Sequence, residues 1–104
     1  MNAAGARTKR QSDALFEEIA TLIVRAGSPF PTSHVRRLVL RATAQYDATD
    51  EMAELIDRLN SSLGNLSAVI EEIGGGFNYN REDAFGNLGA LEAACNRQRR
   101  SMPH

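Results

Sequence analysis

Apolar side chains recur at alternating intervals of three and four residues along the middle of the chain, from Val35 to Ile73. Only two positions of this series, Gln45 and Thr49, are polar. The alternation places the whole series along one face of a helix, and it is typical of a helix that packs against another helix. We call this series the seam. Its positions are Val35, Leu38, Ala42, Gln45, Thr49, Met52, Ile56, Leu59, Leu63, Leu66, Ile70 and Ile73.

The seam predicts one long helix over residues 33–73, capped at its start by Thr32 or Ser33. We expect a break or kink near 47–49, because capping residues there coincide with the two polar positions of the seam. We expect the helix to continue through Gly64, although glycine costs roughly 1 kcal/mol relative to alanine inside a helix. Three glycines at 74–76 then end it, and residues 77–80 complete a loop.

Two shorter helices are predicted on either side of the long one. The first covers residues 12–26, with Ser12 as its N-cap and Gly27 just beyond its end. The second covers about 81–100, and its glycines and alanines make it slim enough to pack closely against the long helix. The apolar positions of the first are Leu15, Phe16, Ile19, Leu22, Ile23 and Ala26, and those of the second are Ala84, Leu88, Leu91 and Cys95.

The predicted fold is therefore all-α, a helical hairpin or bundle in one domain of residues 1–104. Residues 1–10 are predicted to be a flexible basic arm, and residues 101–104 a tail. Both shorter helices are shorter than the seam, so part of the apolar stripe is left without a partner in one chain. We expect a second copy to cover it as a homodimer, since most oligomers are two-fold homodimers.

Composition excludes a uniformly basic protein. The chain is 42% hydrophobic and carries a net charge of −1, with a mean hydropathy of −0.35. Counted by segment, the charge is +4 over residues 1–41, −6 over 42–80 and +1 over 81–104. No stretch approaches the about 18 apolar residues of a membrane span, and the N-terminus has no signal-peptide core, so we expect a cytoplasmic protein without a membrane partner.

Residues for catalysis or metal binding are scarce. Cys95 is the single cysteine and lies in an alanine-rich run, which favours a buried thiol. The histidines are His34 and the terminal His104, neither of which lies in a catalytic or metal-binding motif. The glycine run at 74–76 lacks the Lys-Ser/Thr of a phosphate-binding loop. We therefore predict no catalytic residue, no cofactor and no metal.

The basic residues of the N-terminal part form the candidate binding site. Arg37 and Arg41 are i, i+4 neighbours on one helix face, and the planar guanidinium suits phosphate groups. Contacts of this kind position a nucleic-acid duplex without reading its sequence. The alternative is a solvated arginine face with no partner. The candidate nucleic-acid-binding residues are Arg7, Lys9, Arg10, Arg36, Arg37 and Arg41.

Segments of the chain resemble a known family. Residues 14–41, with the helix ending in Ala26-Gly27 and the later Val35-Arg36-Arg37, look like the helix–turn–helix portion of a ribbon–helix–helix protein. Leu63-Gly64-Asn65-Leu66, the glycine-rich break and the final Ala/Leu helix resemble the C-terminal part of MobC-type plasmid mobilisation proteins. The resemblance implies an accessory protein that helps a relaxase to open plasmid DNA at the transfer origin.

Two classes of function follow. The first is a dimeric DNA-binding accessory protein of a mobile element, which contacts phosphates through arginines and has duplex DNA and a relaxase as partners. The second is a helical protein–protein interaction module, such as an antiactivator, adaptor or inhibitor, that uses the acidic long helix as its contact surface and has no nucleic-acid role. An enzyme is the least favoured class.

Overall fold

The computed structural model describes residues 3–27, 29–71 and 76–101. These residues form four helices and, within those ranges, no strand: α1 Ala3–Val24, α2 Thr32–Thr43, α3 Asp50–Glu71 and α4 Phe77–Ser101. The prediction of an all-α fold is confirmed.

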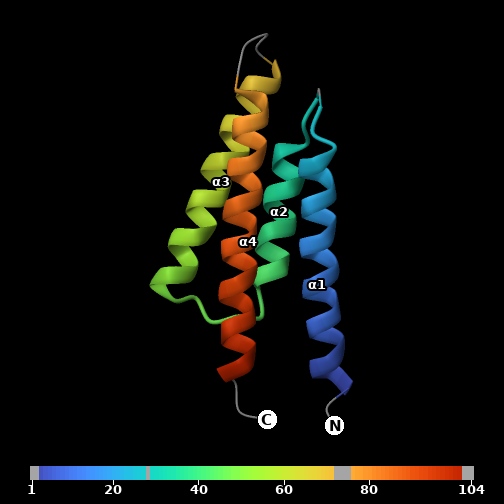
Figure 1. The fold of residues 1–104 in the computed structure, drawn as a ribbon. Helices are drawn as coiled ribbons and strands as arrows, with labels where there is room; N and C mark the ends of the chain where they lie inside the picture. The colour runs from blue at the N-terminus through green and yellow to red at the C-terminus, as the bar shows by residue number, and fades with distance from the viewer. Residues whose placement is uncertain (1–2, 28, 72–75, 102–104) are drawn as a thin grey trace.

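The four helices alternate in direction, so that the start of α1 and the end of α4 lie at the same end of the molecule (Figure 1). Helix α1 packs on α2 and α4, and α3 packs on α4 and α2. The bundle is elongated, with extents of 52 × 24 × 18 Å. We call the end that holds the start of α1, the connection between α2 and α3 and the end of α4 the terminal end.

The region predicted as a long helix over 33–73, with a break or kink near 47–49, forms two helices, because the chain leaves helical geometry between Thr43 and Asp50. The predicted site of the break is correct. Thr49 is the N-cap of α3: its hydroxyl accepts a hydrogen bond from the backbone N–H of Met52 at 3.1 Å. Asp50 and Glu51 in the first turn add negative charge where the helix dipole favours it. These local signals reverse the chain, so the two halves of the seam lie on separate antiparallel helices.

The seam is covered within one chain. Its described positions are buried, apart from half-buried Ile56 and Ile70 and exposed Gln45 and Thr49, and Ile73 lies outside the described residues. The surplus apolar stripe that motivated a homodimer is therefore absent from the described part of the seam. The buried hydrophobic core consists of Phe16, Ile19, Ile23, Phe30, Val35, Leu38, Val39, Ala42, Tyr46, Met52, Leu59, Leu63, Leu66, Ala84, Leu88, Leu91, Ala94 and Cys95.

Helix α1 begins at Ala3, nine residues before the predicted start. The segment predicted as an arm thus continues the helix as far as Ala3, and its alanine, arginine and lysine residues are good helix formers. Ser12 is consequently not an N-cap. It is 1% exposed in the middle of α1, and its hydroxyl donates to the carbonyl of Ala42 at 3.0 Å.

Helix α4 also begins earlier than predicted, at Phe77 instead of about residue 81. Gly76 adopts a positive φ of 100°, which a glycine tolerates readily. The backbone N–H and the side-chain amide of Asn80 both donate to the Gly76 carbonyl, at 2.9 and 2.7 Å. The Arg81 guanidinium lies over the Phe77 ring, 5.2 Å from its centre. These contacts close the first turn of α4 over residues expected to be a loop.

Candidate nucleic-acid interface

Arg36 links α2 to α3 through a hydrogen bond. Its Nη2 donates to the backbone carbonyl of Asn60 on α3 at 2.9 Å. A Cβ placed on Gly64, one turn further along α3, would lie 3.0 Å from the same nitrogen. The glycine therefore gives the guanidinium room against α3, which explains why a residue unfavourable inside a helix occupies position 64. One nitrogen of the Arg36 guanidinium is thus engaged by α3, although the side chain as a whole is exposed.

Arg37 and Arg41 remain available on the outer face of α2. Both side chains are exposed, and neither makes a hydrogen bond or ion pair with another residue of the described part of the chain. Leu40 lies between them and is 59% exposed. The pair therefore presents two unneutralised guanidinium groups one helical turn apart.

The basic residues Arg7, Lys9 and Arg10 belong to the first turns of α1, and their side chains lie outside the described residues. Their backbone places them at the terminal end. Helical periodicity puts positions 7 and 10 on the face of α1 that continues to Ala14. Further along, a groove of about 500 Å³ between α1 and α2 is lined by Gln11, Ala14, Leu15, Glu18, Arg41, Ala44 and Gln45.

The end of α4 adds arginines that were not among the predicted binding residues. Arg97 forms an ion pair with Glu51 on α3, and Arg99 forms one with Asp13 on α1 at 3.2 Å. Arg100 is exposed and has no ion partner among the described residues. In the sequence, the Arg-Gln-Arg-Arg run at 97–100 could have marked these residues as candidates for binding. Only the antiparallel packing of α4 on α1 shows that the run lies at the same end as the N-terminal basic residues.

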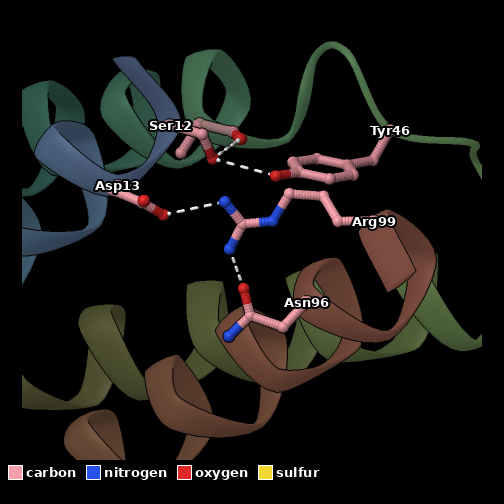
Figure 2. A network of polar contacts seen from close by, with 6 residues as sticks. Ser12, Asp13, Tyr46, Asn96 and Arg99 are labelled. Carbon is pink, nitrogen blue, oxygen red and sulfur yellow. Dashed lines mark hydrogen bonds and ion pairs between the residues drawn. The ribbon is translucent and has the colours of Figure 1, made fainter. Parts of the chain in front are cut away.

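Figure 2 shows the polar contacts that hold the terminal end together. The Arg99 side chain extends from α4 toward Asp13, and its other terminal nitrogen donates to the side-chain oxygen of Asn96. The Tyr46 hydroxyl lies 3.5 Å from the Oγ of Ser12, the residue before Asp13 in α1. Asp47 accepts a bond from Gln98 through its carbonyl, and its N–H donates to the Gln98 side chain. Side chains from α1, from α4 and from the connection between α2 and α3 thus fix this end.

The charge of the terminal end is positive although the whole chain is slightly negative. Residues 3–13, 41–51 and 97–101 contain seven basic and four acidic residues, a net charge of +3. The basic residues are Arg7, Lys9, Arg10, Arg41, Arg97, Arg99 and Arg100, and the acidic ones are Asp13, Asp47, Asp50 and Glu51.

His34 stands apart from the basic residues of the terminal end, whereas Cys95 lies one helical turn before Arg99 in α4. The His34 Nε2 lies 4.0 Å from the Glu18 carboxylate, and both side chains are about half exposed. Cys95 is 1% exposed. Burial raises the pKa of its thiol to about 11; Arg99 lowers the pKa and Glu92 raises it. At neutral pH the thiol is therefore protonated and acts as a small packing group.

Features of other kinds of site are missing from the described residues. No three His, Cys, Asp or Glu side chains gather there in a way that would hold a metal ion. Within the same ranges, every helix is too short or too polar to cross a lipid bilayer. No protein-family model, curated protein or solved structure matches this chain.

Proposed function

We propose that the protein is a DNA-binding accessory protein that contacts phosphate groups through Arg37 and Arg41 together with the basic start of α1. The observation that supports this most is the exposure of these two α2 arginines without a carboxylate partner among the described residues. Most other arginines on the described surface of α3 and α4 are already engaged by protein groups. An arginine pair held free on a rigid helix is therefore the group best suited to an external anion.

Binding of this kind depends on local charge. The net charge of −1 disfavours strong nonspecific attraction by the whole surface. The +3 terminal end attracts a duplex from one side only, and phosphate contacts orient the protein without selecting a sequence. The proposal therefore implies weak, salt-sensitive binding, because only a few phosphates are neutralised.

The proposal extends to the assembly and its location. The resemblance to MobC-type proteins implies two copies of the chain acting in the cytoplasm, with a relaxase as partner at a plasmid transfer origin. The second copy then binds through a surface other than the seam, which is covered within one chain in its described part. Sedimentation velocity at micromolar concentration, with and without duplex DNA, tests this. We expect twice the 11.4 kDa chain mass; a single-chain species in both conditions removes the dimer from the proposal.

DNA binding is tested by fluorescence anisotropy with a labelled duplex at several salt concentrations. The double variant Arg37→Ala/Arg41→Ala is expected to bind about tenfold more weakly at about 50 mM salt, because two phosphate contacts are lost. The slope of log affinity against log salt concentration should fall by about 1.8, since each contact contributes about 0.9.

Arg25→Ala is the matched control, because Arg25 is an exposed arginine without an ion partner among the described residues and lies just beyond the opposite end of α1. It removes one charge but should leave both affinity and salt slope nearly unchanged. Absence of binding by the parent protein at about 50 mM salt, or equal losses in the control and the double variant, would show that the proposal is wrong.

A further inference from the structure

A second groove lies on the opposite side of α1, between α1 and α4. It has a volume of about 410 Å³ and is lined by Asp13, Phe16, Glu17, Ala20, Phe85, Leu88, Gly89 and Glu92. None of its lining residues belongs to the α2 arginine pair or to the seam. The groove thus shares only Asp13 with the terminal end and none of its lining with the two α2 arginines.

The floor of this groove is apolar and its edges are acidic. Phe16 and Leu88 are buried at 2% and 5% exposure, and Ala20 and Phe85 are half-buried beside them. Three carboxylates, those of Asp13, Glu17 and Glu92, flank the floor, and no Lys or Arg lines the groove. Arg99 neutralises only Asp13, at 3.2 Å. An apolar floor between negative edges complements an amphipathic segment with basic flanks.

The two glycines in the middle of α4 support close approach of a partner. Gly86 and Gly89 have no atom within 4 Å of a Cβ placed on them, so the packing of the chain itself requires neither glycine. Each costs roughly 1 kcal/mol relative to alanine in a helix. Gly89 lines the groove, where a missing side chain lets another backbone come near, whereas Gly86 lies outside the lining, about 60° away around the helix axis.

We propose that this groove binds a basic amphipathic helix of a partner protein. Apolar residues of that helix lie on half-buried Ala20 and Phe85, above the buried Phe16 and Leu88, and its Lys or Arg side chains lie beside Glu17 and Glu92. This mode of recognition uses several apolar anchors at helical spacing, which a groove between two helices accommodates.

The charge and geometry favour this occupant over two others. A nucleic acid is repelled by the carboxylates of Glu17 and Glu92, which no arginine of the lining neutralises. A second copy would offer its α2 face, with Leu40 between Arg37 and Arg41, but that face supplies one large exposed apolar anchor. Such a head-to-tail contact also joins two different surfaces and does not close after two copies.

The experiment measures the anisotropy of a labelled peptide on addition of the full-length protein. The probe is an amphipathic peptide of about 18 residues, with Leu at i, i+3, i+4 and i+7 and Lys at the flanks. A second peptide has Glu in place of every Lys. We expect the Lys peptide to bind, and the Glu peptide to bind at least about tenfold more weakly.

Paired variants locate the binding surface. Glu17→Gln/Glu92→Gln should weaken binding roughly fivefold to tenfold, because two edge charges are lost. Its control is Asp57→Asn/Glu82→Gln, which removes the same charge from exposed residues outside the groove. The control should change affinity by less than about twofold.

The glycines give a readout in which stability and binding change in opposite directions. Gly89→Ala and Gly86→Ala should both raise the melting temperature, because each improves helix propensity without a clash. Only Gly89→Ala should weaken peptide binding, by about fivefold or more, because its methyl group enters the groove.

Three outcomes overturn the proposal. The first is equal binding of the two peptides or no binding of either, and the second is equal losses in the two charge-paired variants. The third is self-association of the parent protein that Gly89→Ala abolishes, which would assign the groove to a second copy. Loss of DNA binding in the Arg37/Arg41 variant has no bearing on these results, so the two proposals fail separately.

Discussion

At the scale of single residues, contacts with neighbouring helices decide what a side chain does, and they separate residues that look alike in the sequence. Arg36 and Arg37 are neighbours, yet Arg36 donates to the Asn60 carbonyl on α3 while Arg37 faces outward. Ser12 is a residue type that often caps helices and precedes a helical apolar pattern in the sequence, but it is buried against α2. Burial raises the pKa of the Cys95 thiol, and this leads to a prediction about stability at alkaline pH.

Stability should fall between about pH 9 and pH 11 because of Cys95. In the unfolded chain the thiol ionises near its ordinary pKa of 9.0, whereas burial keeps it protonated in the folded protein up to about pH 11. Over this interval the unfolded state binds fewer protons than the folded state, so rising pH favours unfolding. The full effect is of the order of 2–3 kcal/mol.

Urea unfolding from pH 8 to 11 measures this effect, with Cys95→Ala as the comparison. The variant starts from a lower stability because it leaves a small cavity, but its stability should decline less steeply above pH 9. Parallel curves for the two proteins would contradict the assignment of the decline to Cys95.

At the scale of secondary structure elements, capping and inter-helix hydrogen bonds determine where helices end and how they pair. Thr49 caps the start of α3, at the break that divides the predicted long helix into two. At the end of α2 the hydrogen-bond donor comes from another helix, because Ser12 of α1 donates to the carbonyl of Ala42. That carbonyl is among the last four of α2, the ones that a helix leaves without an N–H partner of its own.

Ser12→Ala should therefore destabilise the fold by about 1 kcal/mol, since loss of the hydrogen bond outweighs a small gain in helix propensity. For a domain of this size that corresponds to a fall of about 4–8 °C in melting temperature. Thermal unfolding followed by circular dichroism measures it.

Two variants serve as controls for Ser12. Ser61→Ala changes an exposed serine of α3 and should be neutral or slightly stabilising. Tyr46→Phe removes the hydroxyl that lies 3.5 Å from Ser12 Oγ, a long contact, and should cost less than Ser12→Ala. A Ser12→Ala variant as stable as the parent would mean that the bond to Ala42 makes no net contribution.

At the scale of the whole molecule, antiparallel packing determines where charge collects. The basic N-terminal residues lie at the same end as the arginines of 97–100, because α1 and α4 run in opposite directions (Figure 1). The acidic edges of the α1/α4 groove arise from the same packing, which brings Glu17 and Glu92 to one groove. A chain of net charge −1 thus presents a positive end and a negative groove. The proposed DNA contact and the proposed helix-binding groove both depend on this separation.

The sequence by itself determined the helical character, the apolar faces and the break near Thr49, because these depend on contacts within a few residues: helical periodicity, capping and glycine. It predicted that Arg37 and Arg41 share one helix face, since an i, i+4 spacing survives in any helix. Only the tertiary structure decided that the seam is buried within one chain, that Arg36 donates to α3, and that the two basic ends of the chain lie at one end of the bundle. These features join residues far apart in the chain, and local periodicity carries no information about which helices become neighbours.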